Sequence, residues 1–372
     1  MSAEPIPLAP ETRVRRWHAW LVVWRVHRWL GFLAGALTVL LSATGSLLVV
    51  HHELEARLER DRRFAPEDAT LASAPLRDVA RQVAALAPPG YRLLRLLPAD
   101  EPDAAHQFIF AGGPDNQRWS AFVAPRSGRV LWHGADQALF TPWLLGLHMQ
   151  LHAGKAGYVA TGLAGIGLTL LGLSGLYLHR ERWRGLWRAP FRPSRGWRVA
   201  LGDLHRWIGI AAIYFPLVLG VTGTIYAVTS LRAKPPVAAD PPSIATLAEF
   251  EPMLATARER FPDAEVLRLQ FPADRSGPVV ALVVHRGNPP WQKFSRLEFD
   301  ARTGALKRVR AAEAATPREQ FASMLAPLHF GFYGATWVKW AYFVGGLAPA
   351  LLALTGWGLA WIRRRGAPAR AR

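Results

Sequence analysis

The sequence predicts an α-helical membrane protein, in which a bundle of four transmembrane helices arises from a tandem repeat and carries two outer α+β modules. Three observations support this fold class: long uncharged runs, arginine confined to particular connections, and a motif that occurs twice. A helix needs about 20 apolar residues to cross a hydrocarbon layer of ~30 Å. Four uncharged runs are that long: Trp29–Val50, Ala156–Leu178, Trp207–Leu231 and Trp340–Ile362.

Arginine marks the connections that we expect to face the cytoplasm. The net charge of +18 would fit a nucleic-acid partner, but the positive charge is concentrated beside the apolar runs. Residues 1–28, 179–202 and 363–372 carry five, seven and five arginines against two, one and no acidic residues. The long segments 51–146 and 231–328 are nearly balanced. The positive-inside rule therefore predicts four crossings with both termini inside, and the expected partner is membrane lipid, with no nucleic acid.

The chain contains no cysteine, which limits the cofactors that it can hold. Disulfides, thiolate metal sites, iron–sulfur clusters and covalently attached haem are all excluded. Arg15-Arg16 would fit a twin-arginine signal, but the apolar run that follows is longer than a signal sequence requires. We therefore expect an uncleaved first helix, and any redox centre must be held by histidine, methionine, tyrosine or carboxylate.

A repeat relates the two halves of the chain. His27-Arg28-Trp29-Leu30-Gly31 returns as His205-Arg206-Trp207-Ile208-Gly209, 178 positions later. Similar offsets of 176 to 178 relate Gly45 to Gly223, Gly128 to Gly304 and His152 to His329. Each half has two crossings, so the halves are expected in parallel orientation about an axis along the membrane normal.

Each long outer segment contains one predicted helix followed by a small antiparallel sheet. The helices are expected at 76–86 and 247–260 because apolar residues recur there at helical spacing. Short apolar stretches between turn residues predict the strands. These stretches are 91–97, 107–111, 119–123 and 129–132 in the first segment, and 266–271, 279–285, 294–299 and 305–309 in the second.

Histidines at the helix ends form two predicted clusters at opposite membrane faces. His27 and His205 open two helices at the same depth on the inner side, so they are expected to face each other. On the outer side, His148 and His152 are four positions apart, which places them on one helix face, and His329 opens the equivalent helix. The other histidines near helix ends, His51, His52 and His179, are interpreted as interfacial residues.

Two imidazoles per cluster suit haem iron better than zinc. Tetrahedral zinc needs three or four close ligands, whereas six-coordinate haem iron needs two axial imidazoles from facing helices. We therefore predict two haem b groups, the inner one held by His27 and His205 and the outer one by His329 with His148 or His152. Arg28 and Arg206 are possible partners of the haem propionates, and no catalytic residue is assigned.

Small residues within the apolar runs are interpreted as packing residues. Gly162, Gly165 and Gly167 lie inside a run and not at a strand-to-helix turn, so they indicate no dinucleotide site. Thr44-Gly45 and Thr222-Gly223 receive the same interpretation. Without a dinucleotide site, electrons would enter from a quinol or from a separate cytoplasmic reductase.

These motifs resemble the PepSY-associated transmembrane family, bacterial inner-membrane proteins that include iron-regulated ferrisiderophore reductases. The resemblance rests on the two His-Arg-Trp motifs, on Leu147-His148 to Gly154, on Leu328-His329-Phe330-Gly331, and on the turns at 124–130 and 300–304. It implies two periplasmic PepSY-like modules and a di-haem reductase that delivers electrons to iron in a ferric siderophore. The family pattern points to His148 as the outer ligand, whereas the internal repeat points to His152.

Two other functions stay open. One is a non-enzymatic siderophore or peptide transport component, or a PepSY-type regulator; the other is a haem electron-transfer subunit for another periplasmic acceptor. The predicted segments are a cytoplasmic N-terminus 1–28, helix 29–50, module 51–146, helix 147–178, cytoplasmic loop 179–202, helix 203–231, module 232–326, helix 327–362 and cytoplasmic tail 363–372.

Overall fold

The computed structural model describes residues 10–67, 70, 72–99, 101, 103–113, 116–180, 190–233, 242–333 and 335–365. Residues 181–189 of the predicted basic loop, and the predicted terminal segments before 10 and after 365, lie outside these ranges. The chain divides into two compact units, which we call the helical unit and the sheet unit. The helical unit is drawn from Met1–Leu47, Leu147–Arg232 and Trp340–Arg372, and the sheet unit from Leu48–Gly146 and Ala233–Lys339.

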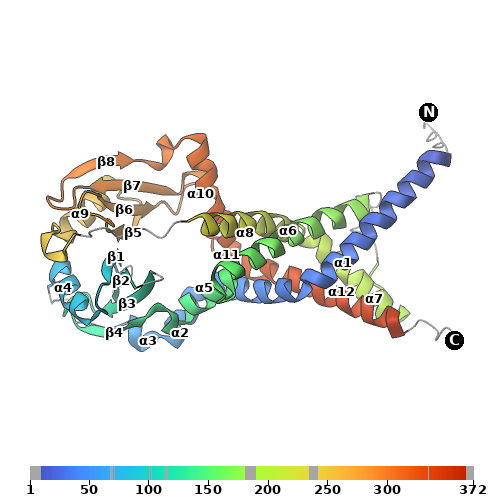
Figure 1. Ribbon diagram of the computed structural model, residues 1–372, viewed down its shortest axis with the longest axis horizontal. Helices are drawn as coiled ribbons and strands as arrows, with labels where there is room; N and C mark the ends of the chain where they lie inside the picture. The colour runs from blue at the N-terminus through green and yellow to red at the C-terminus, as the bar shows by residue number, and fades with distance from the viewer. Residues whose placement is uncertain are drawn as a thin grey trace. The chain divides into compact units, whose positions relative to one another are not determined.

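The helical unit contains the apolar helices (Figure 1). Among the described residues, four stretches are long and apolar enough to cross a membrane: Trp17–Val49, Gly154–His179, Tyr214–Arg232 and Thr336–Arg363. These stretches belong to five helices: α1 (Pro10–Val49), α6 (Gly154–His179), α8 (Tyr214–Arg232), α11 (Thr336–Gly346) and α12 (Ala348–Arg365). A further helix of this unit, α7 (Trp197–Ala211), precedes α8 and is not part of these stretches.

Helix α1 is longer than the predicted first helix, which began near Trp29. It starts at Pro10, a residue that fits the first turn because its missing N–H needs no partner there. No glycine or proline interrupts the chain between Pro10 and His27, so the helix continues through the charged segment. The start of the apolar run is therefore not the start of the helix.

The second predicted helix is two helices, α5 (Phe140–Gln150) and α6. Leu151 and His152 separate them and adopt left-handed backbone angles, with φ of 53° and 52°. The turn is tight: a Cβ atom on Gly157 would lie 1.6 Å from the carbonyl oxygen of Gln150. His148 and His152 therefore do not share one helix face, and that prediction was wrong.

Proline interrupts the third and fourth predicted helices. The predicted third helix is interrupted between α7 and α8. Pro216, in the first turn of α8, has no N–H and cannot donate a backbone hydrogen bond to the preceding turn. A second break separates α11 from α12, with Pro349 in the first turn of α12. Further upstream, Gly331 ends α10 (Pro317–Phe330) in a left-handed conformation with φ of 73°.

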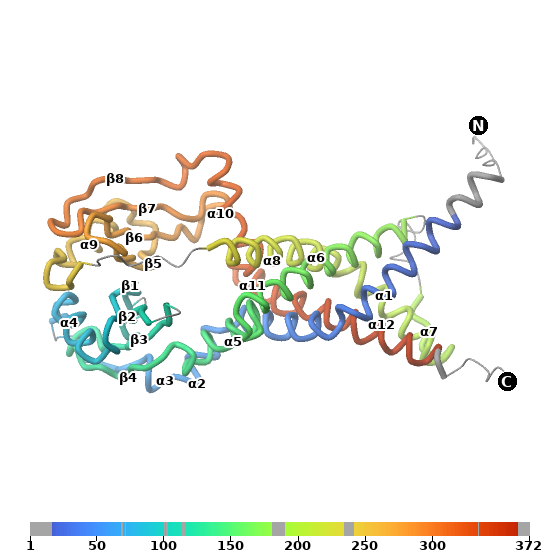
Figure 2. Tube along the Cα trace, in the orientation of Figure 1, coloured from blue at the N-terminus to red at the C-terminus, as the bar shows by residue number. Residues whose placement is uncertain are grey.

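Glycines allow α6 and α8 to pack closely, and both ribbon and tube views show these helices side by side (Figures 1 and 2). A Cβ atom on Gly165 would lie 2.9 Å from the carbonyl oxygen of Gly220, and one on Gly220 would lie 2.8 Å from that of Gly165. The backbones thus approach as small residues permit in membrane helices. The interpretation of Gly165 as a packing residue is confirmed.

The sheet unit is built on one antiparallel sheet of eight strands in the order β4-β3-β2-β1-β5-β6-β7-β8. Each half of the sheet is a four-strand meander preceded by a helix, α4 or α9. The elements lie close to the predicted segments: α4 (Leu76–Leu86), β1 (Arg92–Leu97), β2 (His106–Gly112), β3 (Gln117–Val123), β4 (Val130–Ala135), α9 (Phe250–Arg260), β5 (Glu265–Gln270), β6 (Val279–Val284), β7 (Phe294–Phe299) and β8 (Leu306–Arg310). Two short helices, α2 (His51–Leu58) and α3 (Arg60–Arg63), precede α4.

The two halves join through a short seam between β1 and β5. Only Arg95 opposite Gln270 and Leu96 opposite Leu269 pair across it. The N–H of Phe271 also donates to the carbonyl of Leu94 at 3.0 Å. The predicted pair of small sheets is therefore a single sheet.

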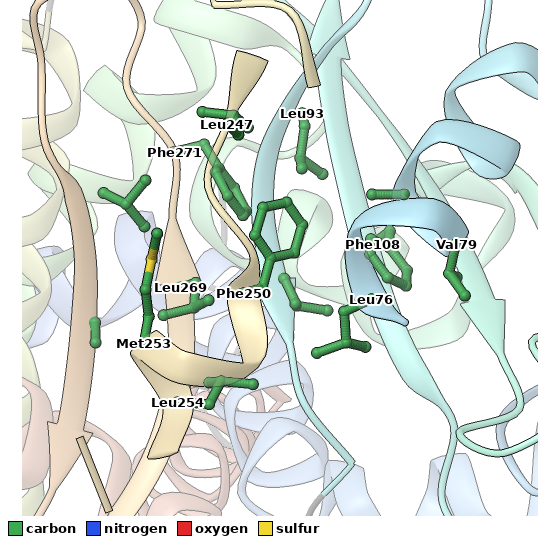
Figure 3. Packing of buried hydrophobic residues seen from close by; sticks show 14 of the residues in the cluster. Leu76, Val79, Leu93, Phe108, Leu247, Phe250, Met253, Leu254, Leu269 and Phe271 are labelled. Carbon is green, nitrogen blue, oxygen red and sulfur yellow. The ribbon is translucent and has the colours of Figure 1, made fainter. Parts of the chain in front are cut away.

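One hydrophobic core runs through both halves (Figure 3). The buried residues of α4 recur at helical spacing and face the strands: Leu76, Val79, Ala80 and Val83. Phe250 of α9 is fully buried and contacts Phe271, with ring centres 4.9 Å apart. Because α4 and α9 both contribute to this core, it holds the two halves together.

Candidate functional site

The structure brings His27 of α1 and His205 of α7 together in the helical unit. The centres of their imidazole rings are 6.4 Å apart, and the ring planes are nearly perpendicular at 89°. Both side chains are half-buried. The facing pair expected from the repeated motif is therefore present in the structure.

A hydroxyl group on a neighbouring helix contacts the Nδ1 atom of each ring. Nδ1 of His27 lies 2.7 Å from Oγ of Ser174 on α6, and Nδ1 of His205 lies 2.8 Å from Oγ1 of Thr355 on α12. Each hydroxyl donates its own proton to a backbone carbonyl four residues earlier, Leu170 or Leu351. The oxygen must then accept from an Nδ1–H, so the lone pair of each imidazole is on Nε2.

His148 is held in the same way by Thr44 of α1. Nδ1 of His148 lies 2.9 Å from Oγ1 of Thr44, whose proton goes to the carbonyl of Leu40 at 2.8 Å. Gly45 makes room for the ring, since a Cβ atom there would lie 2.9 Å from Cε1 of His148.

Thr44-Gly45 was predicted to serve packing alone, but both residues contact His148. The signal was present in the sequence as a hydroxyl residue followed by glycine within an apolar run. A hydroxyl residue followed by glycine also occurs at Ser174-Gly175 and at Thr355-Gly356. Ser174 is the partner of His27, and Thr355 is the partner of His205. A Cβ atom on Gly175 or Gly356 would lie 3.8 or 3.7 Å from Cε1 of the histidine beside it.

The spacing of His27 and His205 fits a metal ion bound between two imidazoles. A metal ion between the two rings would form two metal–nitrogen bonds of about 2 Å each. With the distance from each ring centre to its Nε2 atom added, the expected separation of the ring centres is close to the observed 6.4 Å. A hydrogen bond from Nδ1–H is the usual outer partner of a metal-bound histidine. These two residues are therefore suited to be the axial ligands of haem iron.

Two arginines next to His205 form an ion network around the buried Asp203. Asp203 accepts from Nη2 of Arg206 at 2.8 Å and from Nε and Nη2 of Arg192 at 3.0 and 2.8 Å. Nε of Arg206 is buried and has no hydrogen-bond partner among the residues that the structure describes. This buried N–H can donate a hydrogen bond to an anionic group beside the histidine pair, and a haem propionate is such a group.

Arg28, the other predicted propionate partner, lies against tryptophan. Its guanidinium carbon is 4.8 Å from the ring centre of Trp24 and 5.6 Å from that of Trp29. These contacts are cation–π interactions, which the membrane interface favours. The structure thus supports a propionate role for Arg206 more directly than for Arg28.

The remaining predicted residues have different surroundings. His179 ends α6 and is close enough to interact electrostatically with both His27 and His205. His152 is exposed in the turn after α5. His329 is in the sheet unit, half-buried near the end of α10, with its ring 5.2 Å from that of Phe330.

The apolar helices of the helical unit define a multi-pass membrane protein with a separate α+β unit. The chain belongs to the family described as PepSY-associated TM region, which matches residues 24–364. Its sequence is 31% identical over 258 residues to the uncharacterized protein PA4219 of Pseudomonas aeruginosa. This match covers 62% of the chain and 65% of the relative, slightly less than two thirds of the relative's length.

Proposed function

We propose that the chain is a di-haem membrane reductase that passes electrons across the bacterial inner membrane to iron in a periplasmic ferric siderophore. The observation that carries this proposal is the pair His27 and His205, whose rings lie 6.4 Å apart with the Nε2 lone pairs set by outer hydroxyl partners. Haem bound there would supply one-electron transfer, and the absence of cysteine excludes iron–sulfur clusters and covalently attached haem as the redox centre.

The protein's own residues would hold and orient that group. His27 and His205 would hold the haem iron, and Ser174 and Thr355 fix the orientations of the two imidazole rings through Nδ1. Arg206 presents its buried Nε–H and is held in place by Asp203. Haem held by both imidazoles would have no open coordination position, so the chemistry it would supply is electron transfer.

We propose a second haem site that uses His329 and either His148 or His152. The case for His329 rests on the internal repeat of the sequence. Between His148 and His152, the structure favours His148, because Thr44 orients it as Ser174 orients His27. His152 is exposed and lies in the left-handed turn after α5.

The direction of electron flow rests on charge. Arginine-rich segments next to the apolar runs favour a cytoplasmic location for both termini and a periplasmic one for the PepSY-like sheet unit. Electrons would then enter from a quinol or a cytoplasmic reductase and leave on the periplasmic side. Reduction of Fe³⁺ to Fe²⁺ weakens its binding to the hard oxygen ligands of a siderophore, so iron is released.

Anaerobic stopped-flow spectroscopy tests the proposed reaction. The purified full chain is reduced with dithionite, freed of excess reductant and mixed with a ferric siderophore in the presence of a ferrous-specific chelator. We expect rapid oxidation of the haem bands and one Fe²⁺ trapped for each electron lost. The gallium siderophore is the control, because it has the same shape but accepts no electron under these conditions.

Two results would contradict the proposal. Slow oxidation at one rate by all ferric chelates and unrelated acceptors would indicate an electron-transfer subunit for another acceptor. A purified chain that carries no haem would leave the reductase without its redox centre and favour a non-enzymatic transport or regulatory role.

A further inference from the structure

We propose that His51, His52 and Glu55 form a binding site for a divalent transition-metal ion in the sheet unit. The three side chains are on the short helix α2, directly after the apolar stretch that ends at Val49. One ligand atom from each residue lies within 4.8 Å of the other two. This site is separate from the proposed haem ligands and does not depend on them.

The geometry of α2 brings the three ligands together. Val50 breaks the helical path with φ of −107° and ψ of 25°, and α2 begins at the next residue. His51 and Glu55 are four positions apart and therefore share one face of the helix. His52 is adjacent, and the centres of the two imidazole rings lie 4.0 Å apart.

His51 is already oriented as a metal ligand. Its Nδ1 lies 2.8 Å from the backbone carbonyl oxygen of Leu48. A carbonyl can only accept, so Nδ1 carries the proton and Nε2 carries the lone pair that a metal ion requires. A backbone carbonyl on the second nitrogen is the usual outer partner of a metal-bound histidine.

Glu55 is a buried carboxylate with a fixed position. Arg63 binds its Oε1 atom at 3.1 Å and also binds Glu59 at 2.6 Å. An outer ion pair of this kind orients a ligating carboxylate and leaves its second oxygen for the ion. Lys339 is the other nearby cation, and it is neutralised by an ion pair with Glu53.

Two imidazoles and one carboxylate favour zinc, iron, copper or nickel over magnesium or calcium, which prefer oxygen ligands. Metal–ligand bonds of about 2.0–2.2 Å place two ligands of one ion within about 4.4 Å of each other. The three ligand atoms now lie within 4.8 Å of one another, so small rotations of the side chains would bring them to this separation. Three protein ligands leave a coordination position for water or an external ligand.

Zinc binding to the full chain tests this site. The protein is purified in detergent without a histidine tag, stripped with EDTA and titrated with Zn²⁺ by calorimetry, and bound Co²⁺ is followed by its visible absorption. We expect one Zn²⁺ per chain at this site and an affinity at least about tenfold weaker in His52→Ala, because it removes a ligand. His52 is exposed, so its substitution leaves the fold intact.

Glu55→Gln is expected to weaken Zn²⁺ binding as well, and His133→Ala, which changes an exposed histidine of the same unit, is expected to leave it unchanged. Haem content is measured in the same samples and stays equal among all variants. The proposal is overturned if the chain binds no Zn²⁺ at this stoichiometry, or if His52→Ala and His133→Ala bind Zn²⁺ equally well.

Discussion

His205 and Thr355 are joined by a hydrogen bond of 2.8 Å between Nδ1 and the hydroxyl oxygen. The hydroxyl proton is committed to the carbonyl of Leu351 at 2.7 Å, so the imidazole is the donor. One threonine thus fixes both the tautomer and the orientation of a ring that is suited to bind haem iron. The same arrangement at His27 and His148 makes it a general feature of the helical unit.

Replacing Thr355 by alanine tests this role. Loss of the acceptor makes the His205 imidazole a weaker base and frees its ring to turn, so haem affinity is expected to fall by about 10- to 100-fold. For haem that stays bound, the midpoint potential is expected to rise, because a weaker imidazole donor stabilises ferric iron less. Spectroelectrochemical titration of the purified variant measures both effects.

Thr229→Ala is the matched control for that substitution. Thr229 makes the same hydroxyl bond to the carbonyl four residues earlier, at 2.9 Å from Ile225, but its side chain is exposed. We expect wild-type haem content and potential in this variant. Equal changes in the two variants would show that the effect comes from the helix backbone and not from His205.

Gly45→Ala is expected to displace His148. The added methyl group would lie 2.9 Å from Cε1 of the imidazole, closer than carbon atoms tolerate, and the ring must move. If His148 holds the outer haem, the haem content measured by pyridine haemochrome falls by about half. The control is Gly31→Ala, where the methyl group would make an ordinary contact of 3.6 Å with Leu171. Full haem content in Gly45→Ala would instead favour His152 as the ligand.

The sheet unit is expected to lose stability in acid through His106. Burial, followed by the charge of Arg258, lowers the pKa of His106 to about 4 from its ordinary 6.5, and Nδ1 accepts from the N–H of Ala99 at 2.8 Å. The folded pKa is the lower one, so the stabilisation is complete above pH 6.5 and is lost as the pH falls toward 4. The full loss is on the order of 3 kcal/mol.

Pulse proteolysis of the full chain between pH 7.5 and 4.5 measures this dependence. His106→Asn keeps an acceptor for Ala99 but does not titrate, so we expect a flatter pH profile. The same substitution at the exposed His133 serves as the control. An unchanged slope in His106→Asn would assign the acid sensitivity to other groups.

Leu96→Ala tests the seam between the two halves of the sheet. Leu96 and its partner across the seam, Leu269, are both fully buried. Truncation leaves a cavity in the shared core, and the expected cost is about 2–5 kcal/mol in the free energy of unfolding. Urea denaturation followed by tryptophan fluorescence measures this cost. The control is Leu306→Ala on β8, where the side chain is 41% exposed, and it should change the free energy of unfolding by no more than about 0.5 kcal/mol.

Much of the fold could be predicted because its signals are local. Hydrophobic spacing located α4, α9 and the strands, and the turns at Gly128 and Gly304 adopt the left-handed conformation that glycine favours, with φ of 67° and 73°. The breaks within the apolar runs were not predicted, although Pro216 and Pro349 mark two of them. The seam between β1 and β5 leaves no local signal, since it pairs residues far apart in sequence.

The candidate site was only partly visible in the sequence. Repetition of the His-Arg-Trp motif identified His27 and His205, but their hydroxyl partners lie 147 and 150 positions away. No periodicity connects such residues, so only the structure could pair them. The left-handed angles of Leu151 and His152 were not predicted, because leucine rarely adopts that conformation and a histidine adopts it only occasionally.

The absorption spectrum of the purified chain, reduced minus oxidised, tests the central claim most directly. We expect a Soret band and the α-band of low-spin haem b with two histidine ligands, at close to two haems per chain. His205→Ala should lower this haem content while the variant still reaches the membrane. A wild-type chain without a Soret band or extractable haem, or a His205→Ala variant with an unchanged spectrum, would contradict the account.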